Sequence, residues 1–230
     1  EISENNPARL LKNHIPNLPT KHKPALPREE LPEFYRRLIL ASNIERQNKI
    51  AIMLIMLVFV RNNELRGGQW EEVDFKNKRW IIPAERMKHE KMKPKPALCV
   101  PLSDWAIELL QELHTLTGHS RFMFPSRTNV NRHISENTLG KIINEKLGYK
   151  GRATPHGFRA VASSLLYENN FNGGAIETQL AHVEENKIKD SYAYQADYMP
   201  QRIEFMQWYS DYLRERYNQA LQMIQKDKAD

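Results

Sequence analysis

The sequence predicts a mostly helical protein of the α+β class with one small antiparallel sheet of three strands. Apolar residues recur at the three- and four-residue spacing of amphipathic helices in several long segments. Short β-prone stretches are confined to residues 69–102. With 230 residues, of which 40% are hydrophobic and 27% charged, the chain reads as an ordinary soluble globular protein of one domain or two small ones.

Residues 1–27 are expected to form a linker or extended arm rather than core. They contain five prolines and the basic run Lys21-His22-Lys23. The chain also starts without Met, which suggests a fragment of a longer protein. We expect one folded domain over residues 28–230.

The folded part should begin with two helices, over 29–42 and 45–60. The first carries an apolar stripe, whereas the second half of the second helix is uniformly apolar and should be central and buried. Strands are expected over 69–74, 79–82 and 98–102, the first two joined by a turn at Asn77-Lys78.

The connection over 83–97 is rich in basic residues. A basic hairpin tip is usually a solvated loop, but its shape also allows it to enter a DNA groove. Its cations are Arg86, Lys88, Lys91, Lys93 and Lys95.

Five more helices follow the sheet, one of them from Thr154 to about residue 168. Ser103 caps one that Gly118 stops, Ser135 caps another to about residue 147, and a third ends near His182 after Gly173-Gly174. Pro200 opens a long final helix to about residue 225. Its apolar stripe can dock on the same chain or on a neighbouring protomer.

The segment Thr154-Pro155-His156-Gly157-Phe158-Arg159 predicts an anion site at a helix N-terminus. Thr154 suits the N-cap and Pro155 the first helical position. His156 and Arg159 are three residues apart and share one helix face, beside unpaired backbone N–H groups. The alternative is a capped surface helix with two exposed polar residues.

Arg61 is a second candidate for anion binding. It ends the most apolar helix, and Glu64 lies one turn on, able to hold its guanidinium in place. An arginine in this position is often a surface residue with a buried stem. Two guanidinium groups on one phosphate could neutralise developing charge without a metal.

Composition indicates which kinds of partner and which cellular compartment to expect. Lys and Arg exceed Asp and Glu by 34 to 28, giving a net charge of +6, which fits a nucleic-acid partner without establishing one. The single Cys99 excludes an internal disulfide framework. The longest apolar run, residues 51–60, is about half of what a membrane crossing needs, so no membrane partner is expected.

These motifs together resemble the tyrosine recombinase, or phage integrase, family. The resemblance rests on Arg61 in Val-Arg-Asn-Asn-Glu-Leu-Arg-Gly, a hairpin lysine, His156-Gly-Phe-Arg159, Leu180-Ala-His182 and Tyr192, and covers about residues 26–215. Ile82-Pro-Ala-Glu-Arg-Met-Lys88 and Ser135-Glu-Asn-Thr138 look like the branch found in satellite phages and genomic islands. The resemblance implies a DNA breaking-rejoining fold, a catalytic domain over 28–230, and N-terminal DNA-binding domains ahead of the arm.

The resemblance also implies the roles of the site residues. Arg61 and Arg159 would clamp the scissile phosphate, and His156 would bind it and help to remove the tyrosine proton. His182 would bind a phosphate oxygen, Lys88 would protonate the leaving 5′-oxygen, and Tyr192 would attack phosphorus. Other cations are expected to bind DNA: Lys91, Lys93, Lys95, Lys141 and Arg152.

Two positions depart from the family pattern. The family often has Thr-Gly where Val58-Phe59 stand here, and the hairpin is longer than usual, so that Lys93 is an alternative to Lys88. Tyr194 and Tyr198 are alternative tyrosines, but the spacing from His182 selects Tyr192. A zinc site is not expected, because His156 and His182 lack nearby ligand partners.

The function implied is a site-specific integrase that integrates or excises a mobile element through a 3′-phosphotyrosyl intermediate, with no cofactor. The expected partners are double-stranded DNA attachment sites, a homotetramer on DNA, and excisionase or DNA-bending proteins. The expected location is the bacterial cytoplasm, at the nucleoid. Alternatives are a chromosome dimer resolvase, a type IB topoisomerase-like strand transferase, or a DNA-binding regulator on an inactive integrase fold.

Overall fold

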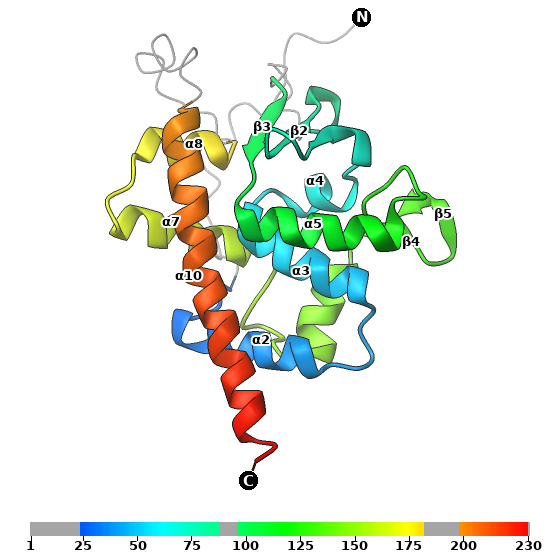
Figure 1. Cartoon of the computed structure of the whole chain (residues 1–230), viewed down its shortest axis with the longest axis vertical. Coiled ribbons are helices and arrows are strands. Elements are labelled where there is room, and N and C mark those ends of the chain that lie inside the picture. The colour runs from blue at the N-terminus through cyan, green and yellow to red at the C-terminus, as the bar shows by residue number, and fades with distance from the viewer. Residues whose placement is uncertain (1–23, 88–95, 182–197, 230) are drawn as a thin grey trace, which may run out of the picture.

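The structure is a computed structural model that describes residues 24–87, 96–181 and 198–229. It is mostly helical with a small antiparallel sheet, as the sequence predicts. The long C-terminal helix α10 (Met199–Lys226) runs along one edge, and α5 (Asp104–Thr117) lies across α3 (Arg46–Val58) (Figure 1).

The core is built around α3. Every side chain from Ile50 to Val58 is buried, in agreement with the uniformly apolar run. Helix α2 (Leu31–Leu40), which follows the 3-10 turn Arg28–Glu30, buries Leu31, Phe34, Tyr35 and Leu38 as one stripe. Leu26, which falls in the predicted arm, is also only 2% exposed and belongs to this core.

The larger sheet has the order β1-β2-β3 and is antiparallel throughout. Its strands are β1 (Val73–Asp74), β2 (Arg79–Ile82) and β3 (Leu98–Pro101), with Trp80 opposite Val100. The strand expected over 69–74 is shorter, because Trp70–Glu72 forms a 3-10 turn that turns Glu72 into the interior. A third 3-10 turn, Ala84–Arg86, follows β2.

The sequence did not predict a second hairpin, of β4 (Pro125–Ser126) and β5 (Asn129–His133). It projects from the body in Figure 1, and β5 has no buried residue, whereas Pro125 of β4 is buried. Beyond it, the helix expected over 135–147 is the short α6 (Thr138–Lys141) followed by a π-helical turn, Ile142–Lys146.

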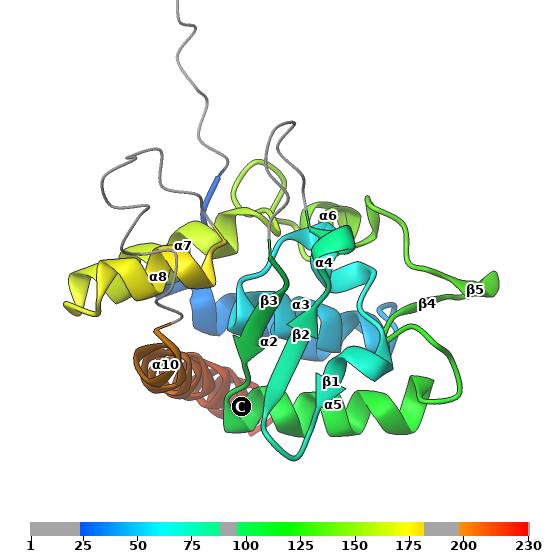
Figure 2. The same ribbon diagram turned by 90° about the horizontal axis from the view of Figure 1, so that it is seen from above.

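The remaining helices position the site. They are α4 (Asn62–Arg66), α7 (Gly157–Glu168) and α8 (Gly173–Gln179). Viewed from above, α4, α6 and the start of α7 lie toward one side, and α5 and α10 toward the other (Figure 2).

Helix α10 packs on its own chain along most of its length. Of the two stripe residues predicted to reach beyond the domain edge, Ile224 is buried and Leu221 is 37% exposed. Asp227 accepts hydrogen bonds from Arg36 of α2. The described residues contain no helix long and apolar enough to span a bilayer.

Candidate active site

Arg61 lies in the sharp turn between α3 and α4. Helix α3 ends at Val58, and the C-cap residue that follows, Phe59, has a left-handed backbone (φ 34°, ψ 37°), an unusual conformation for a bulky residue. Phe59 therefore adopts the conformation that a glycine would enter freely at this position. Its ring is fully buried against Phe205 and Tyr209 of α10, which holds the turn in place.

Glu64 fixes the orientation of Arg61, as the sequence predicted. The Arg61 backbone N–H donates to Glu64 Oε2 at 2.7 Å, and Arg61 Nη1 donates to Oε1 at 3.0 Å. Glu64 is 1% exposed, whereas the Arg61 side chain keeps 22% of its surface exposed. A buried carboxylate thus restrains an arginine that remains accessible to a ligand.

Arg159 is in the first turn of α7 and is only 4% exposed. Its Nη1 donates to the carbonyl of Phe59, and its Nη2 to the carbonyl of Leu180 at 2.7 Å. The side chain therefore ties the start of α7 to the turn after α3 and to the end of α8. Charged hydrogen bonds of this kind are among the stronger ones in proteins.

The structure brings Arg61 and Arg159 together. Arg61 Nη2 donates to the carbonyl of Ala181 at 3.2 Å, so the two arginines bind consecutive carbonyls, of Leu180 and Ala181. Burial, reinforced by the positive charge of Arg61, lowers the pKa of Arg159 to about 10, and Glu64 and Glu177 act in the opposite direction. Arg159 remains a cation at neutral pH, and a bound anion would offset the repulsion.

His156 lies at the same helix terminus. It is the N-cap residue of α7 and is exposed, and its carbonyl accepts the Arg159 N–H at 3.1 Å. The Thr154 hydroxyl accepts the Gly157 N–H at 2.9 Å, so the expected capping bond is present. The helix itself begins two residues later than predicted, at Gly157, because Pro155 and His156 form a turn.

Six of the predicted site residues lie outside the residues that the structure describes: Lys88, Lys91, Lys93, Lys95, His182 and Tyr192. The structure does describe the residue just before Lys88 and the residue just before His182. Met87, next to Lys88, is 3% exposed. Ala181, next to His182, has a left-handed backbone (φ 50°) and carries the carbonyl that Arg61 binds.

Lys141 and Arg152, predicted to bind DNA, differ in their surroundings. Lys141 is the exposed last residue of α6. Arg152 is also exposed, but it is ion-paired with Glu30 and lies over the Tyr149 ring, 5.2 Å from its centroid. A phosphate would have to compete with Glu30 for Arg152.

Arg86 is not part of a solvated basic tip, contrary to the expectation from the sequence. Its side chain is 17% exposed, and its Nη2 donates to Glu72 Oε2 at 2.7 Å. The same carboxylate oxygen accepts Trp80 Nε1 at 3.0 Å, and both Arg86 Nη atoms donate to the Glu64 carbonyl at 3.3 Å. Arg86 therefore anchors the base of the basic connection to the helix that presents Arg61. No spacing rule links residues 14 positions apart, so the Arg86–Glu72 pair could not be predicted from the sequence.

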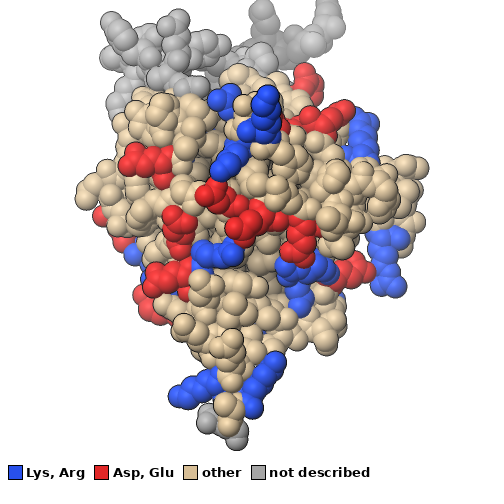
Figure 3. Space-filling view, in the orientation of Figure 1, with Lys and Arg blue, Asp and Glu red and all other residues tan. Residues whose placement is uncertain are grey.

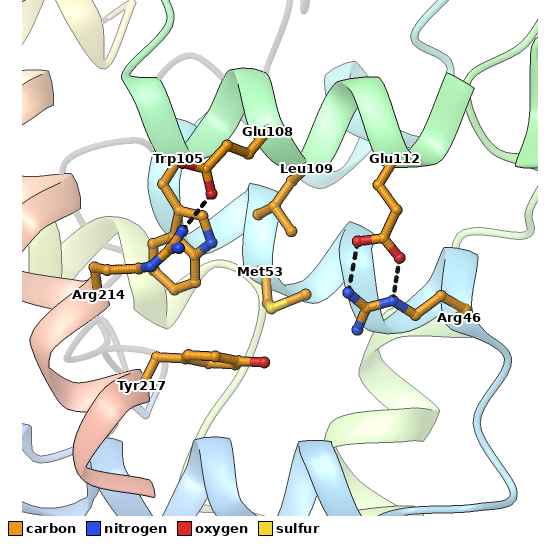
Figure 4. Close-up of a pocket in the computed structure, with 8 residues that line it drawn as sticks. All are labelled: Arg46, Met53, Trp105, Glu108, Leu109, Glu112, Arg214 and Tyr217. Atoms are coloured by element: carbon orange, nitrogen blue, oxygen red, sulfur yellow. Dashed lines mark hydrogen bonds and ion pairs between the residues drawn. The ribbon is translucent and has the colours of Figure 1, made fainter. Parts of the chain in front are cut away.

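A pocket of about 200 Å³ lies elsewhere, between α3, α5 and α10 (Figure 4). Two ion pairs line it, Arg46–Glu112 and Arg214–Glu108, together with Trp105. Acidic side chains gather over α5 and α10 on this face (Figure 3). Asp104, Glu108 and Glu112 belong to α5, and Asp211 and Glu215 belong to α10. The two arginines that line the pocket are already paired with Glu108 and Glu112, so this pocket is a poor candidate for binding the phosphate backbone of DNA.

No group of three metal-ligating side chains occurs within residues 24–87, 96–181 and 198–229. The chemistry of the described site is instead that of two guanidinium groups and an imidazole at a helix N-terminus. Such a site favours a phosphate or another oxyanion.

The fold and the geometry of this site together indicate the class of protein. The structure is similar to that of the Tn1549 transposon integrase in complex with transposon right end DNA, with a TM-score of 0.58, 16% identity, and 88% of this chain and 71% of that chain covered. A lambda integrase tetramer bound to a Holliday junction gives a TM-score of 0.52 at 14% identity, over 76% of this chain and 48% of that one. The fold is that of the tyrosine recombinase catalytic domain.

The sequence comparisons identify the family. The model of the phage integrase family matches residues 26–198. The integrase of Enterobacteria phage P4 is 35% identical over 237 residues, which cover 98% of this chain and 54% of that protein. The chain belongs to the phage integrase family, and it spans about half the length of the curated relatives it matches.

Proposed function

We propose that this chain is the catalytic part of a site-specific DNA integrase that cuts and rejoins duplex DNA through a 3′-phosphotyrosyl intermediate. One observation carries the proposal: Arg61 and Arg159, 98 residues apart in the sequence, converge on the adjacent carbonyls of Leu180 and Ala181. The chain that leaves this point continues directly into His182. Membership of the phage integrase family supports the same conclusion.

The proposed step is an in-line displacement at phosphorus. The Tyr192 phenol oxygen forms a bond to phosphorus while the bond from phosphorus to the 5′-oxygen breaks. His156 helps to remove the phenol proton, and Lys88 donates a proton to the leaving oxygen. The products are a 3′-phosphotyrosyl link and a 5′-hydroxyl. The reverse reaction, with a 5′-hydroxyl of the partner strand, rejoins the DNA without ATP.

The described residues would supply the electrostatic stabilisation that this step needs. A phenol with a pKa of about 10 costs roughly 4 kcal/mol to ionise at neutral pH. Arg61, Arg159 and the positive end of α7 would stabilise both the phenolate and the charge that develops on the phosphate. A lysine acid at the leaving oxygen would contribute about 10²–10⁴ in rate.

The structure supports Lys88 over Lys93 as this acid. Met87 is buried and Arg86 is held by Glu72 and by the Glu64 carbonyl of α4, so the described chain is anchored next to α4 immediately before Lys88 in the sequence. Lys93 is separated from that anchor by five further residues. A lysine next to a fixed backbone loses less entropy when it is positioned.

The proposed partners are double-stranded attachment sites, bound on the side away from the acidic surface of α5 and α10. A homotetramer on two duplexes is part of the proposal, by analogy with the lambda integrase tetramer, as are excisionase and DNA-bending helpers. Affinity should rest on phosphate contacts and fall steeply with salt. A flat salt dependence would contradict this mode of binding.

A covalent trap tests the proposed reaction. The chain is incubated with nicked duplexes of pooled random sequence, in which the cleaved end diffuses away, and protein–DNA adducts are separated on a denaturing gel. Wild type should form an adduct, Tyr192→Phe should not, and Tyr194→Phe serves as the matched control. If wild type and Tyr192→Phe behave alike, the chain is a DNA-binding protein rather than a recombinase. Two-duplex strand exchange with a recovered site then separates an integrase from a topoisomerase.

A further inference from the structure

We propose that Arg202, together with Gln179, is a positioning residue that holds four site-bearing segments in register. The inference rests on the proposed recombinase function. Arg202 is in the first turn of α10 and is 2% exposed, which is rare for an arginine. Burying a guanidinium costs free energy, so the groups that Arg202 binds should indicate why it is buried.

The guanidinium connects two other segments to α10. Arg202 Nε and Nη2 donate to Gln179 Oε1 at 3.1 and 2.7 Å, and Nη2 also donates to the carbonyl of Cys99. Gln179 is the last residue of α8 and is fully buried. Its Nε2 donates in turn to the carbonyl of Val58, the last residue of α3, at 3.3 Å.

Each connected segment adjoins a different part of the candidate site. Val58 precedes the turn that presents Arg61, and Gln179 is three residues before His182. Cys99 is in β3, the strand that closes the basic connection carrying Lys88. Arg202 itself is ten residues after Tyr192. One buried pair thus links the ends of α3 and α8 to β3 and α10, the described elements that adjoin in the sequence the turn of Arg61 and the segments carrying the proposed acid and nucleophile.

Apolar side chains could pack in the same place, but they would not set these distances. A planar guanidinium offers donors in fixed directions, and it aligns the carbonyl and amide groups it binds. Reaction rates depend steeply on such alignment, because a shift of about 1 Å can cost 10²-fold. We therefore expect substitution of Arg202 to slow DNA cleavage more than it weakens DNA binding.

Three variants separate positioning from stability. Arg202→Met keeps the volume but leaves the Gln179 oxygen without its guanidinium donor. The double variant Arg202→Met with Gln179→Met removes both polar partners, which should recover part of the lost thermal stability. Arg214→Met is the matched control, because Arg214 is on the same helix but faces Glu108 and Trp105 at the acidic surface (Figure 4).

The first measurement is the rate of covalent adduct formation at saturating protein, with duplex affinity and melting temperature measured in parallel. Both Arg202 variants should cleave at least 10-fold more slowly than wild type, with affinity within about twofold, whereas Arg214→Met should match wild type. Recovery of cleavage along with melting temperature in the double variant would show that the pair only stabilises the fold. That result would overturn the proposal.

The second measurement does not depend on catalysis, so a failure of the recombinase proposal would not obscure it. Amide hydrogen exchange of the whole chain is followed by mass spectrometry. In Arg202→Met, exchange should rise together at the ends of α3 and α8 and in β3, and in Arg214→Met it should not. A rise confined to α10 would refute the proposed connection between these segments.

Discussion

Gly157 is the position where a single methyl group should report on the contact between the N-terminal segment and the α7 terminus. A Cβ at this position would lie 2.1 Å from the carbonyl oxygen and 3.0 Å from the carbonyl carbon of Pro24, and 3.1 Å from the Cα of Ala25. These neighbours are backbone atoms, so no side-chain rotation can make room. We expect Gly157→Ala to displace residues 24–26 from the start of α7.

The expected loss in free energy of unfolding follows from the apolar surface that those residues bury. Leu26 is 2% exposed, and full burial of a leucine side chain contributes about 1.5–3 kcal/mol. Replacing a helical glycine by alanine returns roughly 0.5–1 kcal/mol. The net loss in free energy of unfolding should be about 1–2 kcal/mol, which corresponds to a melting temperature lower by about 3–6 °C for a chain of this size.

Chemical and thermal denaturation of the whole chain measure this change. Gly140→Ala is the matched control, because this glycine is also helical but a Cβ there meets nothing within 4 Å. It should be neutral or stabilising by up to about 1 kcal/mol. In a double-mutant cycle, Leu26→Ala should cost much less in the Gly157→Ala background than in wild type. Additive costs, or equal effects of the two alanine variants, would refute the reasoning.

Three further predictions concern charge. Arg61→Lys and Arg159→Lys keep the cation but lose the planar fork, so adduct formation should fall about 10²–10³-fold, and unchanged rates would argue that charge alone suffices. Because the pKa of Arg159 is lowered to about 10, its charge is complete at pH 7 and is lost as the pH rises through 10. We therefore expect the stabilisation by inorganic sulfate, measured as a shift in melting temperature, to decrease above pH 10. In Arg159→Met this shift should be small both at pH 7 and above pH 10. Lys141→Ala should lower the slope of log affinity for duplex DNA against log salt concentration by about one. Arg152→Ala should lower this slope less, because Arg152 is paired with Glu30. Equal slopes for the two variants would contradict that distinction.

Local patterns predicted the parts of the fold that depend on local physics. The apolar run of α3, the three sheet strands, the Thr154 capping bond and the Arg61–Glu64 pair are all present. The hairpin of β4 and β5 was missed because its residues are polar and mostly exposed, so no alternation marks them as strands. Its pairing depends on the turn and on neighbouring segments rather than on a buried face.

Long-range polar contacts could not be predicted in the same way. Arg86 was predicted to lie in a solvated basic loop, and no local pattern marks Arg202 as buried, because arginine is usually exposed. Their partners, Glu72 and Gln179, are brought close only by the packing of distant elements. Phe59 is a related case: a bulky residue at a left-handed position is not expected from local preference, and the aromatic side chains of α10 compensate for it.

The buried charges of the described chain share one geometric role. Glu64, Glu72, Arg159 and Arg202 are each less than 9% exposed, and each binds a backbone group or a side chain that lies next to a segment leading to the site. Burying four charges lowers stability relative to apolar packing of the same volume. Their cost is understandable if the orientation of the turns after α3, β2 and α8 matters more than the stability of the core. On that view, apolar replacements that raise the melting temperature should be obtainable at these positions, and they should lower the rate of strand cleavage.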